Sequence, residues 1–194
     1  MTGAGDLSDT TGVILVGGRS RRMGTDKVLL EIRGTPIVKD IFTRMSAVFQ
    51  EILVVGHHRE EFDALGISAI PDLIPESGVL GGIYTGLAEA KTPYIFAVAA
   101  DLPFLDTDLI RHIASRRTGA DAVIPRGPRG LEPLYAVYSR SCRGSMLESL
   151  QRRELKVLEA VAGLRVVSPE IGIAEGRPDP FINLNRPEDL ERME

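Results

Sequence analysis

Residues 12–27 read GVILVGGRSRRMGTDK, and this stretch decides the fold. Residues 12–16 are a continuous apolar run rich in β-branched side chains, which is typical of a strand buried on both faces. Gly17 and Gly18 end the run, and two glycines let the backbone turn sharply and approach a ligand closely. The loop then carries basic residues whose charge suits phosphates, among them Arg21, Arg22 and Lys27. The stretch therefore predicts a buried strand followed by a polyphosphate-binding loop.

The loop differs from two common phosphate-binding motifs. Gly24 is followed by Thr25-Asp26-Lys27, whereas a Walker loop has Lys and then a hydroxyl residue at this point. The GxGxxG spacing of dinucleotide-binding folds is also missing from the stretch. A solvated turn with scattered charges is the simpler alternative. The predicted strand before the loop and the predicted helix after it favour phosphate binding.

Short apolar runs and helical patterns alternate outward from this stretch. Strands are expected at residues 52–55, 67–70, 95–100 and 122–124. One helix is expected from Thr35 as its N-cap, with Pro36 at the first helical position. Further helices are expected from Gly81-Gly82 to residue 90 and from Asp106-Thr107 onward. Less regular patterns follow, with strands near residues 135–138 and 164–167 and helices near 141–151 and 157–161.

This alternation predicts one α/β domain with a mostly parallel, Rossmann-like sheet and helices on both faces, in three layers. In open sheets of this kind, ligands bind beyond the carboxyl ends of the strands. Three polar clusters follow predicted strands, namely residues 17–27, residues 57–59 and Asp101. We therefore expect these clusters at one edge of the sheet.

The composition limits the number of domains and the kinds of partner. With 194 residues, 43% of them hydrophobic and 26% charged, the chain is expected to form one domain over residues 11–194 after a flexible tail over residues 1–10. A net charge of −4 argues against sequence-independent binding of nucleic acid. The apolar runs are all shorter than the roughly 18 residues of a membrane helix. The sequence has one cysteine, Cys142, which favours a reducing, cytoplasmic setting.

Asp101 and Asp72 are the acidic candidates for a site. Asp101 leaves the most apolar strand, where a carboxylate could hold a divalent cation beside phosphates. Its alternative role as a helix cap is already filled by Asp106 and Thr107. Asp72 follows the third strand and is either a site residue or a simple turn former. Residues 78–83, GVLGGI, combine a flexible backbone with a helix N-terminus, which suits either close packing or an anion.

His57-His58 and Cys142 are weaker candidates. Two adjacent histidines point in divergent directions, and no third ligand lies at local spacing, so a solvated loop is favoured over a metal site. Cys142 has no obvious histidine partner in the sequence. A packed or surface thiol is therefore favoured over a nucleophile.

Together these motifs resemble the opening signature of nucleotidyltransferases with a GT-A-like fold, in Leu15-Val16-Gly17-Gly18, Arg22-Met23-Gly24 and Asp26-Lys27. Within that group, the chain is most similar to the molybdenum cofactor guanylyltransferases. The similarity continues through Asp72, residues 78–83, Asp101-Leu102-Pro103-Phe104, Glu132-Pro133-Leu134-Tyr135 and residues 183–190. It covers about residues 12–190.

The resemblance implies a role for each matching residue. The nucleotide would be held by Leu15, Val16, Gly17, Gly18, Arg22, Lys27, Asp72 and Asp101. Catalysis would fall to Lys27, Arg22 and Asp101, and Asp101 would bind Mg²⁺. Contacts with the acceptor or the metal would come from Gly81, Gly82, Asn183 and Asn185. Asn185 also has the spacing of a helix cap with Glu188.

The chain departs from the family pattern at two places. Val16 stands where the family usually has alanine, which is a modest enlargement beside the nucleotide. His57 or His58 stands where family members often place a nucleotide-contacting asparagine. These departures affect the expected contacts with the base.

The resemblance implies transfer of GMP from Mg-GTP to molybdopterin cofactor with release of pyrophosphate. It also implies transient contacts with proteins that deliver or accept the cofactor. A cytidylyltransferase of the same cofactor is the nearest alternative. Gly18 argues against this alternative, because the cytosine-specific members of the resembling families tend to carry alanine at this position. A sugar-phosphate nucleotidyltransferase normally needs a longer chain. A nucleotide-binding module without turnover would not need Asp101 as a metal ligand.

Overall fold

The computed structural model describes residues 6–17, 29–32 and 34–184. One central sheet contains β1 (Thr10–Leu15), β4 (Ile52–Val55), β5 (Ala69–Ile70), β6 (Tyr94–Ala99), β7 (Ala122–Val123), β10 (Tyr135–Ser139) and β11 (Val166–Val167). Two short ribbons are β2 (Glu31–Ile32) with β3 (Thr35–Pro36) and β8 (Arg126–Gly127) with β9 (Gly130–Leu131). The α-helices are α1 (Ile37–Ser46), α2 (Glu60–Ala64), α3 (Gly78–Glu89), α4 (Thr107–Ala114), α5 (Arg143–Gln151) and α6 (Val157–Ala160). A 3₁₀ turn over Arg140–Cys142 precedes α5.

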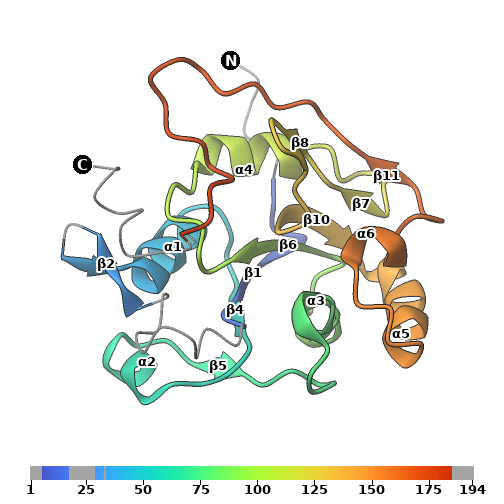
Figure 1. The fold of residues 1–194 in the computed structure, drawn as a ribbon, viewed down its shortest axis with the longest axis horizontal. Helices are drawn as coiled ribbons and strands as arrows, with labels where there is room; N and C mark the ends of the chain where they lie inside the picture. The colour runs from blue at the N-terminus through green and yellow to red at the C-terminus, as the bar shows by residue number, and fades with distance from the viewer. Residues whose placement is uncertain (1–5, 18–28, 33, 185–194) are drawn as a thin grey trace.

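The sheet has the strand order β11-β7-β10-β6-β1-β4-β5 (Figure 1). Strands β6, β1, β4 and β5 run parallel, whereas β10 runs antiparallel to both β6 and β7. β11 runs parallel to β7 at the far edge. The prediction of a mostly parallel sheet is therefore confirmed.

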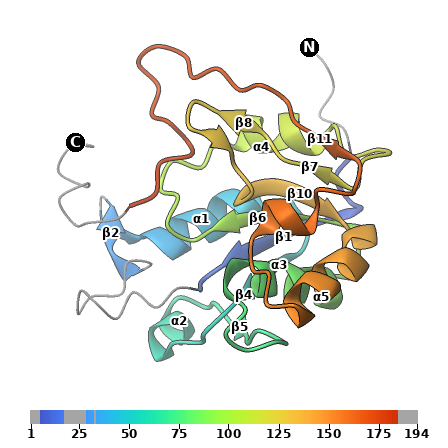
Figure 2. The ribbon, with the colours of Figure 1, turned by 45° about the vertical axis from the view of Figure 1, so that its right-hand side comes forward.

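Helices cover both faces of this sheet (Figure 2). On one face, α1 and α4 bury side chains that include Ile41, Met45, Ile110 and Ile113. On the other face, α3 and α5 bury Leu80, Ile83 and Met146, and α6 adds Val157. Burial of one such side chain stabilises the fold by about 1.5–3 kcal/mol. The three-layer α/β prediction is confirmed.

The start of α1 differs from the prediction. Thr35 and Pro36 form β3, where they pair with Ile32 and Glu31 of β2. Pro36 is the N-cap, with φ −55° and ψ 136°, and Ile37 is the first helical residue. The amide of Ile37 donates to the carbonyl of Leu30 at 2.9 Å. Pairing with the preceding strand thus keeps Thr35 and Pro36 extended and delays the helix.

The start of α3 also differs, because the helix begins at Gly78 instead of at Gly81-Gly82. Both inner glycines serve close packing. A Cβ at Gly81 would lie 2.5 Å from Cβ of Ser77, and a Cβ at Gly82 would lie 3.0 Å from Cδ2 of Leu15. Gly82 therefore lets α3 pack closely against β1, whereas Gly81 lets the segment before α3 fold tightly onto the helix.

The expected flexible tail over residues 1–10 is wrong for its second half. Leu7 is buried and Thr10 belongs to β1. The guanidinium of Arg117 donates to Oδ1 of Asp9 at 2.8 Å and to the carbonyl of Asp6 at 2.7 Å. These contacts, made by a residue more than a hundred positions away, dock residues 6–10 onto the domain. Residues 1–5 lie outside the described part.

Within residues 6–17, 29–32 and 34–184, the helices are all too short to cross a membrane.

Candidate active site

The carboxyl ends of β1, β4, β5 and β6 meet at one edge of the sheet. From β1, the chain builds β4 and β5 on one side and then returns to place β6 on the other side, so that Leu15 pairs with both Val55 and Ala99. The order of the strands therefore reverses between β1 and β6. In open α/β sheets, ligands bind outside the carboxyl ends of the strands at such a switch point. Gly17 follows β1 and Asp101 follows β6, so both lie at this place.

Leu15 and Val16 approach the site through their backbone. Leu15 packs its side chain into the core beside α3, and Val16 packs its side chain into the core beside α1. The carbonyl of Leu15 accepts from the amide of Ala100 at 3.0 Å, and the amide of Val16 donates to the carbonyl of Val55 at 2.9 Å. The bulk of Val16, expected beside the nucleotide, is instead accommodated in the core.

Gly56, at the end of β4, brings a second backbone segment against this loop. Its φ is +134°, a region that L side chains rarely adopt. A Cβ at this position would lie 3.0 Å from the carbonyl carbon of Val16 and 3.1 Å from the amide nitrogen of Gly17. Because both neighbours are backbone atoms, the exits of β1 and β4 can lie this close only when residue 56 has no side chain.

Asp72 presents an unsatisfied acceptor at the same edge. Among the described residues, its Oδ1 atom is buried and has no hydrogen-bond partner. The same atom lies 3.6 Å from the Cβ position of Gly82, close to Leu15. Burial raises the pKa of the Asp72 carboxyl above its ordinary value. A buried acceptor without a donor is costly unless a ligand supplies the donor, so Asp72 is suited to bind N–H or O–H groups of a ligand.

The loop that carries Asp72 is fixed to α3. The buried hydroxyl of Thr85 accepts from the amide of Leu73 at 3.0 Å and donates to the carbonyl of Gly81 at 2.8 Å. These two hydrogen bonds hold Leu73, the residue after Asp72, against α3. The carboxylate therefore has a defined position at the site.

Asp72→Asn is expected to stabilise the free protein by about 0.5–1 kcal/mol at pH 7, because it removes a half-buried charge that remains partly solvated. The folded-state pKa lies above the ordinary value of 3.8, so the native carboxyl costs stability as the pH rises through that folded pKa. The gain in the free energy of unfolding should therefore vanish at pH values below 3.8. Urea unfolding of the variant and the parent at several pH values measures this difference.

Asp63→Asn is the matched control, because the Asp63 side chain is 71% exposed. This variant should leave the free energy of unfolding within about 0.5 kcal/mol of the parent. The same preparations should show that Asp72→Asn loses stabilisation by added nucleotide. If Asp72→Asn is less stable than the parent at pH 7, Asp72 does not serve as a ligand-binding acceptor.

Asp101 joins the end of β6 to a segment from much later in the chain. Its carbonyl accepts from the amide of Leu184 at 2.9 Å, which places Asn183 next to Asp101. The helix-cap alternative for Asp101 does not hold. The carboxylate of Asp106 caps α4 instead, accepting from the amides of Asp108 and Leu109 at 2.9 and 3.0 Å.

The donors at this point fit a magnesium ion. Asp101 offers carboxylate oxygens and Asn183 offers an amide oxygen, which are hard ligands. Groups of three or more His, Cys, Asp or Glu residues that could hold a metal are absent from the described ranges. Mg²⁺ is commonly held by one or two carboxylates together with water and substrate phosphates, so a sparse protein ligand set agrees with it.

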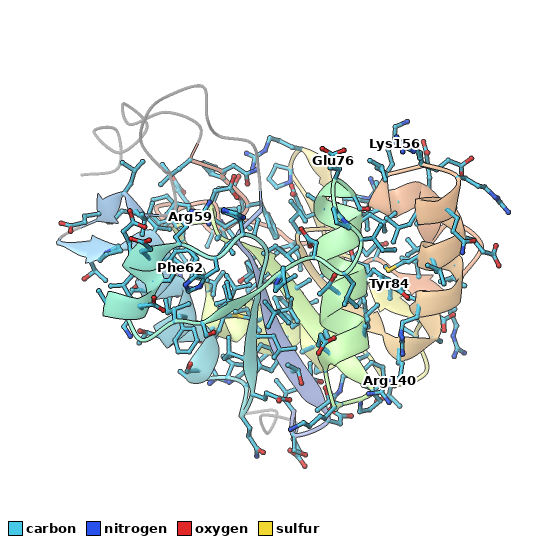
Figure 3. The ribbon with its side chains drawn as sticks, turned by 90° about the horizontal axis from the view of Figure 1, so that it is seen from below. Arg59, Phe62, Glu76, Tyr84, Arg140 and Lys156 are labelled. Atoms are coloured by element: carbon cyan, nitrogen blue, oxygen red, sulfur yellow. The ribbon has the colours of Figure 1, made fainter. Side chains whose placement is uncertain are left out.

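The histidines after β4 lie in an exposed loop, and no metal site includes them among the residues described. Nε2 of His58 lies 3.5 Å from Oδ1 of Asp63. Arg59 is the residue of this loop that reaches the site; the sequence placed it in a polar cluster expected at this edge but gave it no specific role. Its guanidinium donates to the carbonyl of Val16 at 3.3 Å and lies over the ring of Phe62, 5.3 Å from the centroid (Figure 3). A basic residue shortly after a parallel strand was the available signal.

Cys142 is buried, as favoured from the sequence. Burial raises the pKa of its thiol to about 12, so the reactive thiolate is suppressed at neutral pH. Its sulfur lies 3.1 Å from the carbonyl oxygen of Asp121, far along the chain from the switch point. A nucleophilic role therefore has no support.

The structure brings together Leu15, Val16, Gly17, Asp72, Gly82, Asp101 and Asn183. Gly81 packs on Ser77 within the first turn of α3. Four predicted site residues lie outside the described ranges, namely Gly18, Arg22, Lys27 and Asn185. Their roles remain predictions.

The model of the MobA-like NTP transferase domain matches residues 12–166, which include the switch point and its flanking loops. The chain belongs to the MobA-like NTP transferase family. It is accordingly a nucleotidyltransferase, and the predicted enzyme class is confirmed. The GT-A-like fold is confirmed as well.

Curated relatives of this MobA-like chain extend over nearly its whole length. A probable molybdenum cofactor guanylyltransferase from Pelotomaculum thermopropionicum is 38% identical over 187 residues, covering 95% of this chain and 91% of the relative. A second protein of that description, from Natronomonas pharaonis, is 34% identical and covers 96% and 97%.

Solved structures agree with this family. Molybdopterin-guanine dinucleotide biosynthesis protein A from Archaeoglobus fulgidus has a TM-score of 0.78 and 25% identity, covering 94% of this chain and 95% of that one. CMP:2-keto-3-deoxy-manno-octonic acid synthetase, solved with CTP, has a TM-score of 0.74 at 14% identity, covering 96% and 97%, and shows the fold alone.

Proposed function

We propose that this nucleotidyltransferase transfers GMP from Mg-GTP to the terminal phosphate of molybdopterin cofactor and releases pyrophosphate. The observation that supports nucleotide binding is the buried Oδ1 of Asp72 beside the end of β1, which has no hydrogen-bond partner among the residues that the structure describes. A nucleoside offers the N–H and O–H donors that this atom lacks. The choice of acceptor rests on the relatives described as probable molybdenum cofactor guanylyltransferases.

The reaction replaces one phosphoanhydride bond with another. An oxygen of the acceptor phosphate bonds to the α-phosphorus of GTP, the bond from that phosphorus to the bridging oxygen breaks, and its electron pair leaves on pyrophosphate. The acceptor oxygen is already anionic, so alignment and neutralisation of charge matter more than a general base. A bound magnesium ion would offset charge on the phosphates.

Each part of the site has a task in this proposal. Asp101 and Asn183 would hold the magnesium ion. The backbone at Gly17 and Gly18 would lie against the guanosine, and Asp72 would accept its hydrogen bonds. The triphosphate would be bound by Arg22 and Lys27. Because Oδ1 of Asp72 lies close to Leu15 at the end of β1 and Asp101 follows the neighbouring strand β6, the nucleotide would span the switch point between β1 and β6.

We expect GTP to be used in preference to CTP. A glycine at position 18 has no side chain to crowd a two-ring base, whereas an alanine there would add a methyl group that favours the smaller pyrimidine. A preference based on size alone is worth about 1–3 kcal/mol, or roughly 10- to 200-fold, so some use of CTP is expected. A competition experiment between GTP and CTP measures this preference. The readout is kcat/KM for pyrophosphate release with molybdopterin cofactor as acceptor.

Gly18→Ala provides the matched variant for this comparison. It should shift the ratio toward CTP and leave the magnesium requirement unchanged. Equal or better use of CTP by the parent protein would refute guanylyl transfer and support cytidylyl transfer on the same fold. Omission of the acceptor is the control that separates transfer from simple hydrolysis of GTP.

A further inference from the structure

The segment after β11, residues 168–184, crosses from the far edge of the sheet back to the site, and we call it the strap (Figure 1). It begins by pairing with β8. The amide of Arg126 donates to the carbonyl of Pro169, and the amide of Ile171 donates to the carbonyl of Arg126, both at 2.9 Å. The strap ends at Leu184, whose amide donates to the carbonyl of Asp101. Its last residues therefore contribute directly to the site.

Arg129, in the turn between β8 and β9, clasps the strap shortly before this end. One guanidinium nitrogen donates to Oδ2 of Asp179 at 2.8 Å, and the other donates to the carbonyl of Phe181 at 2.7 Å. Oδ1 of Asp179 in turn accepts from the amide of Phe181 at 2.8 Å. These three bonds fold residues 179–181 into a fixed turn. The Asp179 side chain is only 14% exposed, so the pair is partly shielded from water.

The clasped turn is also fixed to the core of the sheet. The ring of Phe181 packs edge-on against Tyr135, with centroids 5.3 Å apart and an interplanar angle of 83°. Tyr135 lies in β10, opposite Val98 of β6, and its hydroxyl donates to the carbonyl of Asp106 at 2.9 Å. The position of the turn is thus defined relative to β6, the strand that Asp101 follows.

Only residues 182 and 183 separate the clasped turn from Leu184. So short a piece of chain, at most about 3.3–3.6 Å per residue, cannot adopt many paths between two fixed ends. Asn183 is therefore located by the clasp on one side and by the Asp101–Leu184 hydrogen bond on the other. Without the contacts of Arg129, Asn183 would be positioned only by the hydrogen bond between Leu184 and Asp101.

We propose that Arg129 is a positioning residue, which fixes the strap so that Asn183 lies beside Asp101. The assignment of Asn183 to the acceptor or magnesium side rests on the proposed function. A lysine cannot replace Arg129, because a single ammonium group does not reproduce the planar fork that reaches a carboxylate and a carbonyl together. The bond to the carbonyl of Phe181 makes the clasp more than a surface ion pair.

The first test needs no substrate. Hydrogen exchange of the Phe181 and Leu184 amides is compared among the parent, Arg129→Ala, Arg129→Lys and Arg126→Ala. The last variant is the matched control, because it removes an exposed ion pair between the same hairpin and the start of the strap, with Nε of Arg126 3.2 Å from Oε1 of Glu170. We expect exchange at both amides to rise on the order of tenfold in Arg129→Ala and less in Arg129→Lys. Arg126→Ala should match the parent.

The second test uses pyrophosphate release from GTP with molybdopterin cofactor. Arg129→Ala should raise the KM for the acceptor or the half-saturating magnesium concentration on the order of tenfold, and leave the KM for GTP within about twofold. Unchanged exchange at Phe181 and Leu184 would overturn the proposal. So would an equal rise of exchange in the β1 amides, because Arg129 would then be a general stabiliser of the fold.

The two arms separate this proposal from the function it rests on. A parent protein that releases no pyrophosphate from GTP with this acceptor would refute the proposed function, while the exchange measurements would still decide whether Arg129 fixes the strap. Asp179→Asn is a milder second variant, because its amide oxygen can still accept from Arg129. It should raise exchange at Phe181 less than Arg129→Ala does, and exchange that is unchanged in both variants would exclude the clasp.

Discussion

Asp101→Asn should lower the rate of nucleotidyl transfer about 10²- to 10³-fold, the effect typical of removing one well-placed electrostatic group from an active site. Asparagine keeps the size of the side chain, and the backbone carbonyl that accepts from Leu184 is unaffected. The substitution removes the negative charge that a hard cation favours. Pyrophosphate release across a magnesium titration should show both a lower maximum and a higher half-saturating concentration.

The control for this prediction is Asp108→Asn. Asp108 lies on α4, its side chain is 91% exposed, and its contact with Arg111 is 3.5 Å long. It should leave both the rate and the magnesium titration unchanged, because exposed ion pairs contribute little. If Asp101→Asn behaves like this control, then Asp101 has only a structural role and the metal ligands must be sought at Asp72 or Asn183.

Gly56→Ala should reduce the free energy of unfolding by about 1–3 kcal/mol and weaken nucleotide binding as well. The cost has two sources. An alanine would have to adopt φ near +134°, and its Cβ would press on backbone atoms of Val16 and Gly17 at 3.0 and 3.1 Å. Backbone cannot rotate away as a flexible side chain can, so the end of β1 must move. Urea unfolding and the thermal shift caused by GTP measure the two effects.

Gly66→Ala separates strain from displacement of the loop. Gly66 has φ +68°, but a Cβ there would meet no described atom within 4 Å. This control should lose about 1–2 kcal/mol of stability through backbone strain alone and keep the full thermal shift with GTP. Equal nucleotide-induced shifts in both variants would show that the approach of Gly56 to Val16 has no bearing on the site.

Local patterns were sufficient for the central strands and for the layers. Residues 95–100 are apolar without interruption because β6 is covered on both faces, and Asp106 is a capping residue whatever surrounds it. The first and last residues of helices and strands were harder to predict from local patterns. Thr35 and Pro36 carry a good helix-start signal, yet pairing with Glu31 and Ile32 holds them in a ribbon. A long-range or cross-strand contact therefore overrides a local preference of moderate strength.

The position of a candidate site residue was predictable where that residue directly follows a strand. Gly17, Asp72 and Asp101 each follow a recognisable apolar run, and parallel topology brings such positions to one edge. Arg59 lies in a polar cluster that was expected at this edge, but its contact could not be assigned from the sequence, and Arg129 follows no such strand. Both arginines donate to backbone carbonyls, of Val16 and Phe181. Because every residue has a carbonyl, the sequence does not indicate which one accepts. Positioning by such bonds becomes visible only once the chain path is known.

The hydrogen bond between Leu184 and Asp101 has a consequence for protein synthesis. Translation proceeds at about 5–20 residues per second, so several seconds pass between the emergence of the two partners. During that interval, a nascent chain can pair β1 with β4 and β6 and present its nucleotide side, while the side occupied by Asn183 is still incomplete. A ribosome-bound chain would thus bind substrate before it could consume it, and ligand present in the cell could act on the enzyme as a folding aid before turnover begins.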